Sequence, residues 1–266
     1  MTFLQPFRSF SQTHKQQIKY VLTDIDDTLT VDGKLPAIAY NAMELLQNAG
    51  IKVIPITGRP AGWCDHFARM WPIDGLVGEN GAFYFYYDSE NRKMIRKFWR
   101  SDTQRKKDKN VLAGLQEQIL REVPGCMVSC DQSYREADLA IDFCEDVEPL
   151  PMHQVKKIVS IFEAAGAIAK ISSIHVNGWF GNYDKLAMTR MFFSDVFQVD
   201  LDKHKEEMLF SGDSPNDSPM FAFFPNSVGV ANILQFADEI DSKPAWLTEK
   251  KGGYGFAEMV DILLDR

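Results

Sequence analysis

The stretch VLTDIDDTLT, residues 21–30, decides the fold and carries three aspartates within four positions, directly behind an apolar run. The apolar run is typical of a buried strand, so Asp24, Asp26 and Asp27 would stand together where that strand ends. Like charges crowded at such a place repel one another and destabilise the fold. Their presence therefore predicts a cation, or a reaction that uses carboxylates, at this point of the chain.

Apolar runs of the same kind recur along the chain and alternate with helical patterns. Residues 36–50, PAIAYNAMELLQNAG, begin with a proline suited to a helix start and end with a glycine suited to a helix stop. Continuous apolar runs that alternate with helices favour a mostly parallel sheet covered on both faces, which is a Rossmann-like three-layer α/β core. The further runs are IKVIPITGRP (51–60), DGLVGENG (74–81), EMLFSGDSPND (207–217) and SVGVAN (227–232).

Polar residues stand where most of these runs end. Ligands of open parallel sheets bind at the carboxyl ends of the strands, so we expect a site built from these residues. They are Asp24 after the first run, Thr57 and Arg59 after the second, Glu79 and Asn80 after the third, and Asp213 and Asp217 after the fourth.

Pro55 lies inside the second run, where a proline removes a hydrogen-bond donor from the ladder of a central strand. We retain the strand and expect a local irregularity near its end.

The middle third of the chain shows a different pattern. Its strand-like pieces show partial alternation of apolar and polar residues, and helical stretches at roughly 102–122 and 151–165 lie among them. We therefore expect an inserted α+β module with an antiparallel sheet. The predicted organisation is an N-terminal extension at 1–18, a core formed by 19–84 and 182–266, and the insertion at 85–181.

Bulk properties exclude several classes of function. The net charge of −8 argues against general affinity for nucleic acid or for an anionic membrane. No apolar stretch reaches the roughly 18 residues of a membrane helix, and the N-terminus lacks the apolar segment of a signal peptide. The cysteines Cys64, Cys126, Cys130 and Cys144 form neither a CxxC pair nor a zinc spacing. We expect reduced thiols in a cytoplasmic protein.

The spacing of the aspartates indicates which chemistry they serve. A calcium loop of the EF-hand type is excluded, because counting from Asp24 puts Thr28 at position 5, Leu29 at position 6 and Leu35 at position 12. A carboxylate nucleophile two residues before a carboxylic acid fits instead, since both project to the same side of an extended segment. Such a nucleophile forms an aspartyl-phosphate, and a hard divalent cation bridges it and the phosphate oxygens.

Four motifs together resemble the haloacid dehalogenase superfamily of phosphohydrolases. They are DIDDT (24–28), TGR (57–59), Lys185 in GNYDKLAM (181–188) and GDSPND (212–217), in the order and at the strand ends of that family. The resemblance spans about residues 19–264. The long insertion between the second and third motifs resembles the α/β cap of subclass IIB, which includes trehalose- and sucrose-phosphate phosphatases, Cof-type phosphatases and phosphomannomutase.

This resemblance implies roles for individual residues. Asp24 is expected to be the nucleophile and Asp26 the general acid and base, while Thr57 and Lys185 bind the transferring phosphoryl group. Mg²⁺ is the implied cofactor, held by Asp24, the Asp26 carbonyl and Asp213, with Asp217 supporting it. Asp27 is read as a turn or capping residue. The expected substrate-binding residues are Thr28, Gly58, Arg59, Asn80, Arg135, His175, Asn177, Trp179 and Asn216.

The predicted function is a Mg²⁺-dependent phosphatase of a small phosphorylated metabolite, foremost a sugar phosphate, acting through an aspartyl-phosphate. A phosphomutase on the same scaffold and a catalytically idle phosphate-binding protein are the alternatives. The expected partner is a small phosphate ester, with no nucleic acid and no membrane; the oligomeric state is left open.

The cap is expected to choose the substrate, and two of its features have alternative interpretations. Trp179 either packs in the interior of the cap or lines the cleft against a sugar ring. Residues 92–109 carry nine basic and two acidic residues, which indicates either a solvated face or a surface that attracts anions.

Overall fold

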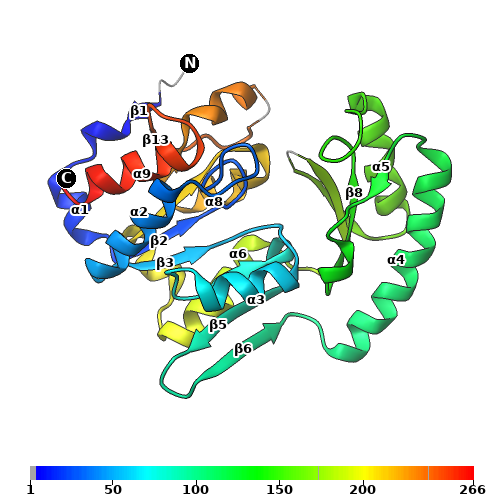
Figure 1. Ribbon diagram of the computed structural model, residues 1–266, viewed down its shortest axis with the longest axis horizontal. Helices are drawn as coiled ribbons and strands as arrows, with labels where there is room; N and C mark the ends of the chain where they lie inside the picture. Colours follow the sequence, from blue (N-terminus) through cyan, green and yellow to red (C-terminus); the bar gives the residue numbers. More distant parts are fainter. Residues whose placement is uncertain (1–3, 173, 239) are drawn as a thin grey trace.

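The structure is a computed structural model that describes residues 4–172, 174–238 and 240–266. Figure 1 shows two bodies side by side, a larger one that contains both chain termini and a smaller one built around α4, α5 and β8. In the described ranges, no helix combines the length and the apolar character needed to cross a bilayer.

The larger body is built on a six-stranded sheet in which every neighbouring pair is parallel. The strand that carries the opening sequence lies in its interior, with Val21 paired to Val53 on one side and to Leu209 on the other. The expected mostly parallel α/β core is thereby confirmed. In sheet order the strands are β1 (Gln5–Pro6), β13 (Trp246–Leu247), β12 (Asn226–Gly229), β11 (Met208–Gly212), β2 (Tyr20–Thr23) and β3 (Lys52–Pro55).

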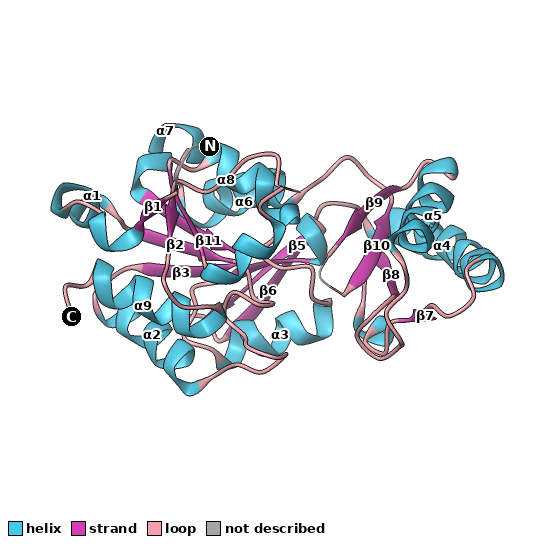
Figure 2. Cartoon of the chain, turned by 90° about the horizontal axis from the view of Figure 1, so that it is seen from above, coloured by secondary structure: helices cyan, strands magenta, loops and turns pink. Residues whose placement is uncertain are grey.

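Helices cover both faces of this sheet because successive side chains of a buried strand point in opposite directions. Val21 belongs to the apolar cluster of one face and Leu22 to that of the other. Figure 2 shows the two helical layers on opposite sides of the strands. The first layer contains α2 (Ala37–Asn48), α3 (Ala61–Met70) and α9 (Gly252–Leu263), and the second contains α6 (Lys185–Phe192), α7 (Leu201–His204) and α8 (Ser218–Phe223).

A three-stranded antiparallel sheet lies next to β3. It consists of β4 (Leu76–Gly78), β5 (Phe83–Asp88) and β6 (Lys93–Phe98). A single parallel bridge between Ile56 and Val77 links it to the chain that continues β3. The amide of Ile56 donates to Thr23 in β2, and the amide of Thr57 donates to Val77 in β4. Because backbone amides alternate in direction along a strand, the backbone nitrogen of Pro55 faces β4. Because proline has no N–H, pairing with β4 is confined to the residues beyond it, which is the irregularity that the sequence predicted.

The smaller body has its own antiparallel sheet and its own apolar core. Two helices, α4 (Asp102–Glu122) and α5 (Met152–Ala164), cover the face of this sheet that points away from the larger body (Figure 2). Side chains such as Leu115, Phe162 and Val176 fill the space between helices and sheet. Its strands in sheet order are β7 (Met127–Val128), β8 (Asp138–Asp142), β10 (His175–Trp179) and β9 (Ile168–Ile171).

The boundaries of the two bodies bear on the predicted division of the chain. Residues 83–98 pair with β4 beside the core sheet, and not with the four strands around β8. We therefore propose that the cap begins near residue 100 and ends near residue 181.

The predicted N-terminal extension has a defined place where it is described. Its first three residues lie outside the described ranges, and the next ones form β1, which pairs with β13. Phe7 and Phe10 are buried and pack edge-on against Trp246. Residues 4–18, including α1 (Gln12–Gln17), thus add an edge strand and two aromatic side chains to the core. Short turns of helix lie at η1 (Phe7–Ser9), η2 (Glu79–Gly81), η3 (Gln132–Tyr134), η4 (Phe193–Phe197), η5 (Lys205–Glu207), η6 (Pro215–Asp217) and η7 (Ala231–Phe236).

Candidate active site

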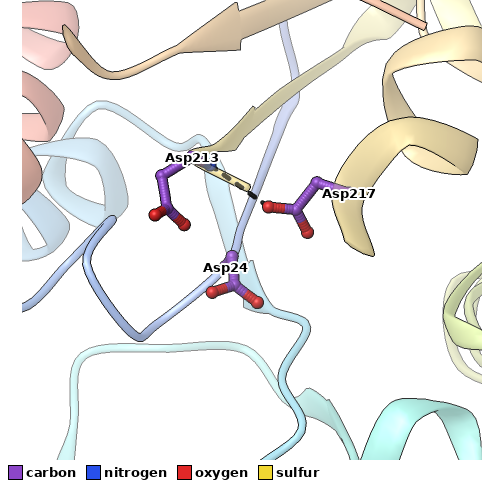
Figure 3. A group of neighbouring side chains, drawn as sticks. All are labelled: Asp24, Asp213 and Asp217. Atoms are coloured by element: carbon purple, nitrogen blue, oxygen red, sulfur yellow. Dashed lines mark hydrogen bonds between the residues drawn. The ribbon is translucent and has the colours of Figure 1, made fainter. Parts of the chain in front are cut away.

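Three buried carboxylates meet at the carboxyl edge of the core sheet. Asp24 follows β2 and Asp213 follows β11, and these strands are neighbours, so the two side chains emerge side by side. Asp217 comes from η6, immediately after Asp213. One oxygen of each carboxylate lies within 4.8 Å of one oxygen of the others. Figure 3 shows the three side chains next to one another.

Lys185 brings the positive charge to this cluster. Its Nζ lies 2.7 Å from Oδ1 of Asp24 and 3.0 Å from Oδ1 of Asp217. The lysine is the first residue of α6, and the Asp184 side chain caps that helix by accepting a hydrogen bond from the amide of Ala187. Gly81 packs against this turn so closely that a Cβ there would overlap the carbonyl of Asp184. The lysine is therefore held by a fixed helix start.

The charges of the cluster are not balanced by Lys185 alone. Burial raises the pKa of Asp24 to about 7, although the ammonium of Lys185 opposes this shift. Burial and the neighbouring Asp217 carboxylate raise the pKa of Asp213 well above its usual range. Burial by itself would lower the pKa of Lys185, but the two carboxylates keep it above its usual value. A site with several buried carboxylate oxygens and one cation fits a hard divalent ion such as Mg²⁺.

Asp213 is oriented by two hydrogen bonds to its carboxylate. Thr28 donates to Oδ1 over 3.1 Å, and Nδ2 of Asn232 donates to Oδ2 over 3.0 Å. The same Asn232 amide also reaches the carbonyl of Asp27, which adopts a left-handed turn conformation with a φ of 55°. Thr28, expected to contact the phosphoryl group, thus bonds a carboxylate of the cluster. Asn232 was missed, although it closes the run SVGVAN as the other site residues close theirs.

Asp26 is held by Arg59. Nε and Nη2 of the arginine lie 2.9 and 2.7 Å from Oδ1 of Asp26, and Nε also lies 3.0 Å from Oδ2. The backbone N–H of Arg59 donates to the hydroxyl of Thr57, so this hydroxyl supports the turn that carries the arginine. Arg59 reaches the cap as well, with Nη2 at 3.4 Å from Glu145 and Nη1 at 3.7 Å from Asp131.

A cavity between core and cap brings most of the predicted substrate-binding residues together. Asp24 and Asp26 belong to its lining. The predicted residues in its lining are Gly58, Arg59, Asn80, Arg135, His175, Asn177 and Asn216.

Trp179 lies elsewhere. It is buried, with 2% of its surface exposed, and it stacks on Tyr183 at a centroid distance of 5.8 Å. It borders a second and larger cavity, which also touches Asn80, Lys185 and Asn216. Trp179 packs in the apolar cluster that also contains Phe83 and Tyr183, and its contact with a sugar ring stays a prediction.

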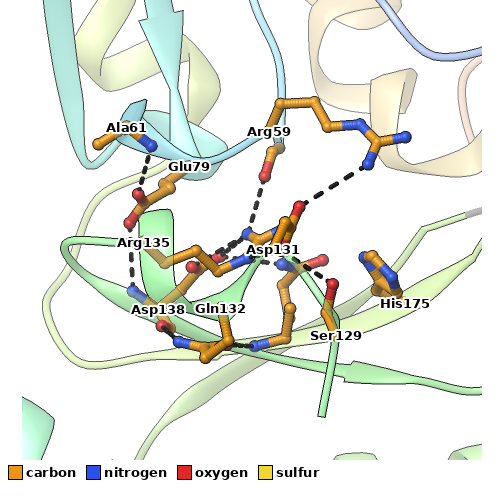
Figure 4. A network of polar contacts seen from close by, with 12 residues as sticks. Arg59, Ala61, Glu79, Ser129, Asp131, Gln132, Arg135, Asp138 and His175 are labelled. Atoms are coloured by element: carbon orange, nitrogen blue, oxygen red, sulfur yellow. Dashed lines mark hydrogen bonds and ion pairs between the residues drawn. The ribbon is translucent and has the colours of Figure 1, made fainter. Parts of the chain in front are cut away.

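The cap side of the first cavity is a network of buried charges (Figure 4). Arg135 is 4% exposed; its Nε lies 2.8 Å from Asp131, and its Nη1 lies 3.1 Å from Asp138. Nδ2 of Asn177 donates to Oδ2 of Asp138 over 2.9 Å, and Nε2 of His175 lies 2.9 Å from Glu145. The sequence predicted the arginine, histidine and asparagine as site residues but did not reveal their acidic partners. An aspartate inside the apolar run ADLAIDF is a signal of this kind, because a buried charge needs a partner.

Within the basic segment, intramolecular partners account for four of the side chains. Arg96 pairs with Asp65, Arg100 with Asp108, Arg105 with Asp102, and Lys109 with Glu136. Arg105 also covers the ring of Phe98.

A family model described as haloacid dehalogenase-like hydrolase matches residues 21–138. The matched range contains the first two motifs and runs into the cap. Comparison with curated proteins found no match.

Solved structures share the fold over nearly the whole of both chains. A protein from Thermoplasma acidophilum is 18% identical with a TM-score of 0.72, over 93% of this chain and 98% of that one. A haloacid dehalogenase-like hydrolase from Bacteroides thetaiotaomicron is 16% identical with a TM-score of 0.63, over 92% and 98%. The sucrose-phosphatase of Synechocystis, solved with sucrose and phosphate, is 13% identical with a TM-score of 0.61, over 93% and 98%. At sequence identities this low, the structural similarity shows the shared fold alone.

The parallel-sheet core, the carboxylate cluster at its edge and the second body with its own sheet define an α/β protein with an inserted cap. More particularly, the match over residues 21–138 confirms the predicted resemblance to the haloacid dehalogenase-like hydrolases, and the solved structures share the fold over nearly the whole chain.

Proposed function

We propose that the protein is a Mg²⁺-dependent phosphatase that hydrolyses a phosphate ester of a small polyhydroxylated metabolite, foremost a sugar phosphate. The convergence of Asp24, Asp213 and Asp217, two of which bond Lys185, beside a cavity between core and cap supports this proposal.

In the first step, an oxygen of the Asp24 carboxylate attacks the phosphorus, and the bond from phosphorus to the leaving oxygen breaks. Asp26 gives its proton to that oxygen, so that the product leaves as a neutral alcohol. In the second step, Asp26 takes a proton from water, which attacks the aspartyl-phosphate and releases inorganic phosphate.

The surrounding residues prepare these steps. Lys185 places its ammonium 2.7 Å from the nucleophile, where it offsets the charge of Asp24 and of the incoming phosphoryl group. Arg59 holds Asp26 through both carboxylate oxygens and so fixes where this carboxyl group stands. Asp24, the carbonyl of Asp26, and Asp213 with Asp217 would hold Mg²⁺, which supplies charge neutralisation of the phosphoryl oxygens when it is bound.

The charge state of the cavity supports a neutral leaving group. Both arginines in its described lining are already paired with carboxylates, Arg59 with Asp26 and Arg135 with Asp131 and Asp138. A leaving group with its own carboxylate or second phosphate would need a cation that is not engaged. Hydroxyl groups, in contrast, both donate and accept, and they match the mixed lining of amide, imidazole and paired charges.

Phosphate release from a panel of esters, with and without Mg²⁺, tests the proposal. We expect Mg²⁺-dependent turnover, with neutral sugar phosphates preferred over phosphoglycerate and sugar bisphosphates. Asp24→Asn should abolish turnover to background, a loss of about 10³-fold or more, because the amide is a poor nucleophile.

Asp27→Asn is the matched control, since it removes a carboxylate three residues away and asparagine tolerates the left-handed conformation of Asp27. It should retain activity within a few-fold. Equal activity of wild type and Asp24→Asn would refute the mechanism, and a preference for acidic leaving groups would refute the substrate class. A cytoplasmic location and a lack of nucleic-acid or membrane partners complete the proposal.

A further inference from the structure

Glu79 is a buried charged residue that the proposed reaction does not use. It follows β4 as the first residue of η2, is 0% exposed, and adopts a left-handed conformation with a φ of 42°. A non-glycine residue in this conformation is uncommon and is maintained by its surroundings. The contacts of its carboxylate explain why it is kept there.

The carboxylate of Glu79 joins the core to the cap through backbone N–H groups. On the core side, Oε1 accepts from Ala61, at the first turn of α3, over 2.9 Å. On the cap side, Oε1 accepts from Glu136 over 2.9 Å, and Oε2 accepts from Ala137 over 2.6 Å and from Asp138 over 3.3 Å. Every partner is a donor, which suits an acceptor-only carboxylate. Figure 4 shows Glu79 between Ala61 and the cap segment.

Neighbouring contacts extend this junction. Nη1 of Arg135 donates to the carbonyl of Gly58 over 3.0 Å. Tyr134 leans on the start of α3, where a Cβ at Gly62 would lie only 2.9 Å from the Tyr134 Cβ. The chain itself connects core and cap near residues 100 and 181, and residues 134–138 add a non-covalent attachment, as the contacts of Arg59 with Asp131 and Glu145 do.

The attached segment carries groups that face the cavity. Arg135 lines it directly, and Asp138 orients Asn177, which also lines it. A shift of residues 135–138 away from the core would displace these groups from the reaction centre together.

We propose that Glu79 is a positioning residue, which fixes cap segment 135–138 to the core and so sets where the substrate-facing groups of the cap stand. The kinetic consequence rests on the proposed phosphatase function; the structural consequence does not. The role is one of alignment, since Glu79 accepts only from backbone amides in the described contacts.

Hydrogen–deuterium exchange tests the structural part on the full-length chain. In the wild type, the amides of residues 136–138 should exchange as slowly as those of Ala140 and Ile141 inside β8. Glu79→Gln removes one acceptor oxygen and should speed exchange at 136–138 by about tenfold or more, with β8 interior amides unchanged. The control Glu136→Gln neutralises an exposed carboxylate on the same segment, which pairs only with Lys109 among the described residues, and should leave the exchange unaltered.

Steady-state kinetics test the consequence for recognition. For the best sugar phosphate, Glu79→Gln should lower kcat/KM by about tenfold, chiefly through KM. For p-nitrophenyl phosphate, whose aryl group does not need the polar cap contacts, kcat/KM should stay within about threefold.

The outcomes are distinguishable. A wild type that lacks phosphatase activity but shows slow exchange at 136–138 would refute the proposed function and keep the attachment. Fast exchange at 136–138 in the wild type would overturn the attachment, even if Glu79→Gln cannot be purified. Equal losses for both substrates, or faster exchange throughout the chain, would reduce Glu79 to a general stabilising residue and overturn the proposal.

Discussion

The carboxylate cluster at the edge of the core sheet (the core edge) and the network around Arg135 (the cap face) differ in how their buried charges are compensated. At the core edge, three carboxylates share one lysine, so the charges remain unbalanced and burial raises the pKa of Asp24 to about 7. On the cap face, Arg135 stands between two aspartates, and the guanidinium holds the pKa of Asp131 below its usual value even though burial opposes this. The first arrangement leaves room for an incoming cation and phosphate. In the second arrangement the aspartates already accept hydrogen bonds from Arg135, so it serves as a fixed polar surface of the cavity.

This difference predicts that the core edge determines the reaction and that the cap network determines the stability of the cavity lining. A residue of the unbalanced cluster should affect the reaction more than the stability, whereas a residue of the balanced network should affect the stability first. Substitutions in the two regions measure this contrast.

The largest effect is expected for Lys185→Met. Without the ammonium, the nucleophile and the phosphoryl group repel each other, and kcat should fall by about 10²–10³-fold. The measurement is phosphate release at saturating substrate and Mg²⁺. Lys203→Met, which removes an exposed lysine paired with Asp200, should not change kcat. A loss below about threefold in Lys185→Met would contradict the assigned role.

The next effect concerns the cap network. Arg135→Met leaves the buried carboxylates of Asp131 and Asp138 without their cation, which should lower the free energy of unfolding by about 3–5 kcal/mol. Arg96→Met breaks an ion pair with Asp65 whose arginine is 47% exposed, and should cost less than about 1 kcal/mol. Urea unfolding monitored by tryptophan fluorescence measures both. Similar values for the two variants would mean that the cap face is not a balanced network.

The smallest effect is a pH dependence of stability at the core edge. The pKa of Asp24 is about 7 in the fold and 3.8 as the ordinary value, so the folded state retains a proton that the unfolded state releases. Without metal, the unfolding free energy from this group should therefore decrease as the pH rises from about 4 to about 7, by at most a few kcal/mol. Asp24→Asn should flatten the curve in that window.

Mg²⁺ should reverse this trend because it favours the ionised carboxylates. The stabilisation by Mg²⁺, measured as the shift in urea midpoint, should be larger at about pH 7.5 than at about pH 5. A shift that is independent of pH would argue against carboxylate ligation at this site.

The sequence predicted the core edge well because each of its residues is marked locally. Asp24 and Asp213 directly follow apolar runs, and the rule that strand ends share one edge of a parallel sheet brings them together without further information. The sheet class and the two cap helices have similarly local signals.

The parts that could not be predicted depend on pairings between distant segments. The sequence marks residues 83–98 as antiparallel strands but does not indicate which sheet they join. Likewise, Glu79 stands in a turn sequence, and its bonds to amides 57 to 59 positions further along follow only from the docking of the cap. The acidic partners of Arg135, in contrast, lie within four positions of it, so their pairing is local to the cap.

The strand order of the core also constrains how the chain folds during synthesis. The sheet joins β1 and β2, made first, to β13 and β11, made after the whole cap. The cap sheet, in contrast, uses one continuous segment with β7 to β10. Its contacts are close in sequence, and such contacts form quickly, while the core must wait for residues 208–247. The cap is therefore expected to fold on the ribosome before the core domain into which it is inserted.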